Sequence, residues 1–332
     1  MAAADEPAKE NAAARRARLL HTIAGHCAAE RYSEAVAPAE ELVALNKRDG
    51  RAEYGLAGLL ARLGRTDEAL KHLDRAVKRH DTCATLLKSD PDFANLRDDA
   101  RFAAVAESAD QDAAQEQARS KAVWTLRLPA RYDKWKPAPL IVALHGFGGD
   151  AAGMAALWSR VADDVGAVLL TPEGQFDGPG GGKSWGTGDR NTAARQIMAA
   201  VADTRHRLFI DSERTVLTGF SQGGGMTYGV GLAYPESFRG LIPMAGPFVW
   251  GGDPAFREEK LKRLRIFIIV GSDDANAPLN REAAARFQNA GARVRLNVLQ
   301  GLGHTLPAQP DELLHEALKY VWQPEPSTHP GR

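Results

Sequence analysis

The hydrophobic positions follow two different periodicities along the chain. From residue 12 to residue 120, apolar side chains recur at helical spacing, and no run of residues has a convincing strand pattern. Beyond residue 120, short continuous apolar runs alternate with helix-compatible segments. We therefore expect an all-α domain with its linker over residues 12–120 and an α/β domain over residues 121–322. The ends, residues 1–11 and 323–332, are expected to be a disordered start and a polar tail.

The second region is predicted to form a buried sheet. Strands are expected at Val123–Leu128, Leu140–Leu144, Ala167–Leu170, Thr215–Thr218, Leu241–Ala245, Ile266–Val270 and Val294–Leu299. Helices are expected at Ala155–Val165, Thr192–Arg207, Gln222–Tyr234, Arg281–Ala290 and Glu312–Val321. This alternation indicates a mostly parallel sheet covered by helices on both faces. Functional groups of such a sheet lie in loops at the carboxyl ends of its strands.

The first region contains an internal repeat with a period of 34 residues. Arg31-Tyr32-Ser33-Glu34-Ala35-Val36 returns as Arg65-Thr66-Asp67-Glu68-Ala69-Leu70. This period resembles the tetratricopeptide repeat, a pair of antiparallel helices, and an unrelated helical bundle is the alternative. Residues 86–107 resemble a degenerate capping unit. Such a domain either docks a protein partner or serves as a structural cap or self-association contact.

The most informative motif is Gly219-Phe220-Ser221-Gln222-Gly223, which lies between a predicted strand and a predicted helix. A strand that turns this sharply into a helix forces strained backbone at the serine, so only very small neighbours fit. Gly219 and Gly223 meet that requirement. The motif therefore predicts a nucleophilic serine, Ser221, standing above the edge of the sheet.

A serine hydroxyl needs a base, and the base needs an acid to orient it. Of the nine histidines, His304 lies in a glycine-containing loop directly after the last predicted strand. The loop after the preceding strand offers two carboxylates, Asp273 and Asp274, of which we favour Asp274. Ser221, Asp274 and His304 then occur in the order nucleophile, acid, base, each beyond a different strand, as in α/β-hydrolases.

A developing oxyanion needs preorganised donors. We expect one to be the main-chain N–H of Gln222, at the start of the helix after Ser221. The other is predicted to be the N–H of Phe147, in the loop His145-Gly146-Phe147-Gly148-Gly149, where His145 is expected to be an anchor. This loop lacks the Gly-Lys-Ser/Thr ending of a phosphate-binding loop, and the glycines before Gly182-Lys183-Ser184 are out of register for one. Nucleotide binding is therefore not expected.

These four loops together resemble the phospholipase/carboxylesterase family of α/β-hydrolases. The motifs are His-Gly-Phe-Gly-Gly, Gly-Phe-Ser-Gln-Gly-Gly, Gly-Ser-Asp-Asp and Gly-Leu-Gly-His, and the similarity spans about residues 123–322. More loosely, the same segment is similar to polyhydroxybutyrate-depolymerase-type and feruloyl-type esterases. The resemblance implies hydrolysis of short or medium acyl esters through an acyl-enzyme, without a cofactor. It assigns Ser221, Asp274 and His304 as the triad and Phe147 and Gln222 as oxyanion donors.

Two departures from the family bear on substrate choice. The helical extension before residue 120 is not part of the usual family domain, and the Gly/Pro-rich stretch 176–190 matches the family's tryptophan-bearing loop only faintly. Trp185 in that stretch and Trp250 in a later loop are candidates for lining the substrate pocket. Ordinary packing against the core is the alternative for each ring.

Composition narrows the classes of partner. Lys plus Arg and Asp plus Glu both total 42, so no excess of positive charge suggests nucleic acid or an anionic membrane as a partner. No apolar run approaches the about 20 residues that cross a bilayer. The two cysteines imply no disulfide framework, and the start lacks the pattern of a secretory signal, so a cytoplasmic location is expected. An exported protein whose signal has been removed is the alternative.

The sequence thus predicts a serine hydrolase that cleaves carboxylic esters and needs neither metal nor cofactor. A serine peptidase on the same fold is the enzymatic alternative. An interaction scaffold that carries a degenerate hydrolase domain is the non-enzymatic one. The expected partners are a small-molecule ester and, through the helical domain, another protein or a second copy of the chain.

Overall fold

The computed structural model describes residues 11–79, 84–120, 122–186, 190–248 and 258–324. Residues 1–10 of the expected disordered start and residues 325–332 of the expected polar tail lie outside this part. Two compact units are present. The helical unit comprises the chain up to Glu116 together with two short downstream segments, Asp133–Pro137 and Arg205–Phe209. The α/β unit comprises the remainder.

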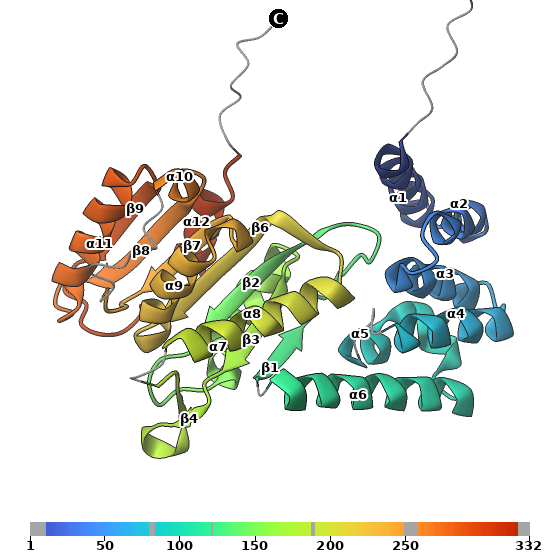
Figure 1. Ribbon diagram of the computed structural model, residues 1–332, viewed down its shortest axis with the longest axis horizontal. Helices are drawn as coiled ribbons and strands as arrows, with labels where there is room; N and C mark the ends of the chain where they lie inside the picture. Colours follow the sequence, from blue (N-terminus) through green and yellow to red (C-terminus); the bar gives the residue numbers. More distant parts are fainter. Residues whose placement is uncertain (1–10, 80–83, 121, 187–189, 249–257, 325–332) are drawn as a thin grey trace, which may run out of the picture. The chain divides into compact units, whose positions relative to one another are not determined.

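The helical unit is a succession of amphipathic helices. They are α1 (Ala12–Ala28), α2 (Tyr32–Leu45), α3 (Gly50–Arg62), α4 (Thr66–Lys78), α5 (Ala84–Ser89), a 3₁₀ helix (Pro91–Leu96) and α6 (Ala100–Ser120). Helix α1 packs on α2, α2 on α3 and α3 on α4, so the sequence repeat corresponds to two helical hairpins (Figure 1). The structure bears out the prediction of a helical region, with no strand among its described residues from 11 to 120.

The repeated Glu-Ala pair begins the second helix of each hairpin. Ala35 and Ala69 are fully buried, and the two helices of each hairpin contact each other. A small side chain at this position lets the helices pack closely. The two copies of the sequence repeat therefore place a buried alanine at the same position of each hairpin.

The α/β unit is built on a seven-stranded sheet. Its strands are β1 (Val123–Arg127), β2 (Ala138–Leu144), β3 (Val168–Glu173), β6 (Ile210–Phe220), β7 (Gly240–Met244), β8 (Arg265–Gly271) and β9 (Arg293–Leu299). The strand order is β1-β3-β2-β6-β7-β8-β9; β1 runs antiparallel to β3, and the other pairs are parallel. All seven predicted strands are present. The Gly/Pro-rich stretch adds a small hairpin, β4 (Phe176–Asp177) and β5 (Lys183–Ser184).

Helices cover both faces of this sheet (Figure 1). The helices that follow α6 along the chain are α7 (Ala151–Asp164), α8 (Arg190–Arg207), α9 (Gln222–Ala233), α10 (Glu258–Leu261), α11 (Ala277–Asn289) and α12 (Asp311–Val321). Helices α7 and α12 contact each other and share a buried apolar cluster with one face of the sheet. On the other face, α9 packs over β6 and β7, and Leu241 lies directly beneath Gly231. Strand β2 is buried along its whole length, as its continuous apolar run predicts.

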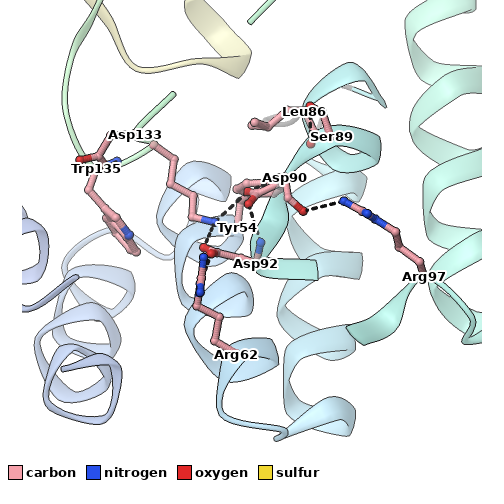
Figure 2. Close-up of polar contacts among 10 residues, drawn as sticks. Tyr54, Arg62, Leu86, Ser89, Asp90, Asp92, Arg97, Asp133 and Trp135 are labelled. Carbon is pink, nitrogen blue, oxygen red and sulfur yellow. Dashed lines mark hydrogen bonds and ion pairs between the residues drawn. The ribbon is translucent and has the colours of Figure 1, made fainter. Parts of the chain in front are cut away.

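A buried ion-pair cluster holds one of the downstream segments within the helical unit (Figure 2). The Lys134 ammonium lies 2.8 Å from an Asp90 oxygen and 2.5 Å from an Asp92 oxygen. Tyr54 donates a hydrogen bond of 2.9 Å to Asp90, and Arg62 pairs with Asp92. Burial alone would lower the pKa of the Lys134 ammonium, but the two carboxylates outweigh it and raise that pKa. The cluster therefore holds the ammonium in its charged form.

The neighbouring tryptophan fills the space above α3. Trp135 is 5% exposed, and a Cβ atom added at Gly55 would lie 2.2 Å from its ring. Gly58 plays the same part beneath Lys134, since a Cβ there would lie 2.5 Å from the ammonium nitrogen. The glycines of α3 thus create the space that Lys134 and Trp135 occupy. Sequence analysis placed residues 133–137 and 205–209 in the α/β domain, whereas the structure packs them with the helices.

Replacing Lys134 by methionine should destabilise the folded protein by about 3–5 kcal/mol, because Asp90 would stay buried without its cation and Asp92 would keep only Arg62. Lys136→Met is the matched control. Its ammonium is 60% exposed in a pair with Asp133, and we expect a loss below about 1 kcal/mol. Urea-induced unfolding followed by circular dichroism measures both. Equal unfolding midpoints for the two variants would contradict a stabilising role for the cluster.

Candidate active site

The turn between β6 and α9 holds Ser221 in a strained conformation. Its φ of 54° lies in the left-handed region that residues with a side chain seldom adopt. Such a residue costs on the order of 1–3 kcal/mol and persists only where its surroundings enforce it. Here the Ser221 N–H donates to the carbonyl of Met244 at 2.9 Å, and its carbonyl accepts from Gly225 at 3.0 Å. The strain turns the hydroxyl out of the strand.

Close backbone contacts explain the two glycines of the motif. A Cβ atom at Gly219 would lie 2.4 Å from the carbonyl oxygen of Gly223. A Cβ atom at Gly223 would lie 2.3 Å from the carbonyl oxygen of Leu144 and 2.5 Å from that of His145. These neighbours are backbone atoms and have no room to move. The glycines thus allow the serine turn to pack directly against the end of β2.

The structure brings Ser221, His304 and Asp274 together in one hydrogen-bonded row. His304 Nε2 lies 2.8 Å from Ser221 Oγ, and His304 Nδ1 lies 2.8 Å from Asp274 Oδ2. Asp274 is 4% exposed, and its other oxygen accepts from the N–H of Asn276 at 2.8 Å. Asp273 instead accepts from the Ser272 hydroxyl at 2.7 Å. Of the two carboxylates, the one that sequence analysis favoured is the one that meets the imidazole.

These three side chains meet because of the order of the parallel strands. Each follows the carboxyl end of a strand, Ser221 after β6, Asp274 after β8 and His304 after β9. The loops after β8 and β9 are joined by a hydrogen bond of 3.0 Å from the Asp273 N–H to the Leu302 carbonyl. The imidazole also contacts the Phe220 ring, with 5.2 Å between ring centroids. Loops that are distant in sequence thus converge at one edge of the sheet.

The loop after β2 lies against the serine turn. A Cβ atom at Gly146 would lie 3.3 Å from Ser221 Cβ, so the two segments are in contact. Within the part of the chain that the structure describes, neither the Phe147 N–H nor the Gln222 N–H donates to another backbone group. The β4–β5 hairpin pins this loop, because Gly148 donates to Lys183 at 2.9 Å and Lys183 donates to Gly149 at 2.7 Å.

His145 is an anchor of this loop. It is 1% exposed, and its Nε2 accepts from the N–H of Gly174 at 2.8 Å. The proton of the neutral ring must therefore be on Nδ1, which donates to the carbonyl of Gly146 at 2.8 Å. Both ring nitrogens are engaged, so His145 is not available to accept a proton from a substrate.

Trp185 supports the same loop through contacts with His145. Its ring is 2% exposed, stacks on His145 at 4.8 Å between centroids, and donates from Nε1 to the His145 carbonyl at 2.8 Å. It therefore does not line the cavity described next, and the alternative of packing against the core describes it better than a pocket role. The other tryptophan proposed for the pocket, Trp250, lies outside the described residues.

The side chain of Gln222 has a role that the sequence did not reveal. Its Oε1 accepts from the N–H of Trp185 at 3.1 Å, and its Nε2 donates to the Gly186 carbonyl at 3.2 Å. The residue that follows the serine thus also holds the segment after β5. These partners are about 36 positions away in sequence, so no local pattern pointed to them.

An apolar cavity of about 350 Å³ opens beside the serine. Its apolar lining comes from Met154 and Leu157 of α7, Phe220 before the serine and Leu306 after the histidine. Gly146 and Thr305 also border it, so it adjoins both the β2 loop and the histidine loop. Sequence analysis assigned the pocket to tryptophans and missed these four residues.

Two further features of the described residues bear on chemistry. No group of three or more His, Cys, Asp or Glu side chains is arranged there to hold a metal ion. None of the helices in that part is long and apolar enough to cross a membrane.

Comparisons with known proteins agree with both units. Residues 188–321 match the family model described as phospholipase/carboxylesterase, and residues 27–97 match a tetratricopeptide repeat model. A Bacillus cereus carboxylesterase of known structure, 18% identical, aligns with 63% of this chain and 98% of its own, with a TM-score of 0.52. The chain therefore combines a tetratricopeptide-repeat region with a domain of α/β-hydrolase fold.

The curated relatives align with a smaller part of this chain than the solved structure does. A bifunctional acetylxylan esterase/xylanase from Neocallimastix patriciarum is 29% identical over 141 residues, which is 41% of this chain and 19% of that protein. A probable feruloyl esterase C from Aspergillus flavus is 28% identical over 137 residues, 39% of this chain and 47% of that protein. The alignments span less than half the length of these two relatives.

The crowding at the serine turn predicts that Gly223→Ala is destabilising. The added methyl group would meet the carbonyls of Leu144 and His145, and we expect a loss of about 1–3 kcal/mol of unfolding free energy. Gly225→Ala, two residues further along α9, meets its nearest atom at 3.1 Å and should change stability by less than about 1 kcal/mol. Urea unfolding of both variants tests this, and equal stability would mean that the turn can relax.

Proposed function

We propose that the chain is a serine hydrolase that cleaves carboxylic esters through an acyl-enzyme intermediate. The observation that carries the proposal is the continuous row of hydrogen bonds from Asp274 through His304 to Ser221. It lies at the carboxyl ends of parallel strands, where the α/β-hydrolase fold places its chemistry. The names of the two curated relatives, both esterases, support the same reaction class.

The geometry suits a two-step acyl transfer. In the first step His304 Nε2 takes the proton of Ser221 Oγ as the oxygen attacks the ester carbonyl carbon. Asp274 stabilises the imidazolium that forms, and the imidazolium gives the proton to the departing alcohol. In the second step water attacks the acyl-enzyme with His304 again as the base, which releases the acid and restores the serine.

The oxyanion formed in both steps needs donors that are already in place. We assign this role to the main-chain N–H groups of Phe147 and Gln222, which border the serine from two different elements. Neither donates to another backbone group of the described chain, so both are free to donate to the substrate. Such a donor is worth about 3–4 kcal/mol of transition-state stabilisation. The contacts of His145, Trp185 and Lys183 described above hold these donors in position.

The apolar cavity is the proposed site of the acyl group. Its volume of about 350 Å³ is at the lower end of the range for small-molecule pockets, about 300–1,000 Å³. A short or medium acyl chain, or a single aromatic ring, suits such a volume. Acetyl and feruloyl groups, named in the two relatives, represent these two kinds of acyl group.

For the repeat region we propose a structural role. Acidic side chains of this region, Asp90 and Asp92, are paired with Lys134 of the same compact unit. The space above Gly55 is filled by Trp135. These contacts favour a supporting function over docking of another protein at this part of the helices.

Ser221→Ala should lower kcat for p-nitrophenyl acetate by about five to six orders of magnitude, because the nucleophile is removed. Asp274→Asn should lower it by about 10⁴, since the imidazole would lose its orienting charge. Asp273→Asn is the matched control and should stay within about twofold of the wild type, because among the described residues the Asp273 carboxylate hydrogen-bonds only to the Ser272 hydroxyl. The rate of p-nitrophenol release measures activity, and a thermal melting curve of each variant shows whether a loss of activity comes from unfolding.

The contrary outcomes are distinct. If Asp273→Asn were the damaging change, the assignment of the acid would be wrong. If a fluorophosphonate probe failed to label folded wild-type protein, the nucleophile assignment would be rejected. A higher kcat/KM for peptide than for ester substrates would keep the triad and replace the ester by a peptide.

Narrowing the cavity should shift the acyl preference. Leu157→Trp would fill part of it, so the ratio of kcat/KM for p-nitrophenyl octanoate to that for the acetate should fall by about tenfold or more. Ala156→Trp, on the exposed side of the same helix, is the control and should leave the ratio unchanged. An unchanged ratio in Leu157→Trp would show that the acyl chain binds elsewhere.

A further inference from the structure

A second cavity, of about 300 Å³, lies in the helical unit and is strongly basic. The described residues that line it include four arginines and one histidine but a single carboxylate. The lining includes Arg16, Asn46, Arg48, Asp49, Arg51 and Arg205. The four guanidinium groups against one carboxylate leave a charge of about three positive units, which contrasts with the zero net charge of the whole chain.

The chain holds two of these arginines in place. The guanidinium carbons of Arg16 and Arg51 lie 5.7 and 6.0 Å from the ring centroid of Phe209, within the range of cation–π contact. Arg16 also pairs with Asp49 at 3.0 Å, and Arg51 donates to the Leu208 carbonyl at 3.5 Å. Positively charged groups are thus fixed around the cavity before any ligand arrives, which reduces the entropy lost on binding.

The single carboxylate is already engaged. Asp49 is the N-cap of α3, where its Oδ1 accepts from the N–H of Ala52 at 3.2 Å while Oδ2 binds Arg16. Arg48 differs from these residues: it is exposed, and its guanidinium makes no hydrogen bond or ion pair with any residue that the structure describes. Burial also lowers the pKa of Arg205. The cavity therefore retains donors and charge for an anion.

We propose that this cavity binds a small molecule that carries one or two phosphoryl groups. Guanidinium groups bind phosphate oxygens through two parallel hydrogen bonds, which suits a cavity lined by several of them. A phosphoryl group carries about 1.5 to 2 negative charges at neutral pH, so one or two of them match the excess charge of the cavity, whereas a single carboxylate does not. The site is independent of the proposed hydrolase chemistry, because all of its residues belong to the helical unit.

Isothermal titration of the full chain with inorganic pyrophosphate tests the proposal, with citrate as a polycarboxylate of comparable charge. We expect one pyrophosphate per chain and binding at least about tenfold tighter than that of citrate, since the guanidiniums favour phosphoryl geometry. Arg48→Gln should weaken pyrophosphate binding by about tenfold, the value of a lost charge-assisted hydrogen bond. Arg48 is exposed and has no partner among the described residues, so its replacement should leave the fold intact.

Two further variants sharpen the outcome. Asn46→Asp keeps the oxygen that accepts from the Arg48 N–H and adds a negative charge to the cavity, so it should weaken binding as well. Arg281→Gln removes an exposed arginine of α11 as a control and should leave binding unchanged. Absence of pyrophosphate binding, or equal affinity in Arg48→Gln, Asn46→Asp and Arg281→Gln, would overturn the proposal. Citrate binding as tight as pyrophosphate would overturn the phosphoryl assignment.

Discussion

The close approach of the serine turn to the end of β2 is the constraint on which the site depends. Gly223 sits against the carbonyls of Leu144 and His145, with no room for a Cβ atom between them. This contact fixes the distance between the nucleophile and the loop that carries Phe147. The same contact explains the positive φ of Ser221, because the chain must turn sharply between β6 and α9 to keep Gly223 against β2. Strain at one residue is thus offset by contacts made by its neighbours.

Around this contact, hydrogen-bonded side chains support the groups proposed to react. His145 uses both ring nitrogens, Trp185 stacks on it, and Gln222 joins the serine turn to the segment after β5. Asp274 is buried, whereas the side chain of His304 is 43% exposed and faces the opening. The site therefore combines buried supporting side chains with one imidazole that is accessible from the opening. This arrangement favours preorganised donors over movement during the reaction.

Sequence patterns predicted the seven strands, the helical repeat and the loops that carry Ser221, Asp274 and His304, because each depends on local periodicity or on a strand end. The choice of Asp274 over Asp273 agrees with the observed hydrogen bond. Features that depend on distant contacts were not predictable. The lining of the apolar cavity by α7, the bonds of the Gln222 side chain and the buried position of Trp185 all join segments that no local pattern connects. The same holds for residues 133–137, whose lysine and tryptophan find their partners in helices about 40 to 80 positions earlier.

The late position of Lys134 and Trp135 in the sequence has a consequence for how the helical unit folds during synthesis on the ribosome. The helical unit begins at the first helix, yet its final pieces are encoded as far downstream as Phe209. At a synthesis rate of about 5–20 residues per second, the nascent helices wait on the order of ten seconds for those pieces. Lys134 and Trp135 are made first, about one to four seconds after Glu116 at this rate, and until then the space above Gly55 stays open and Asp90 and Asp92 lack their lysine. Vectorial synthesis thus delays the completion of the helical unit until Phe209 has been made, although its first helices are made at the start.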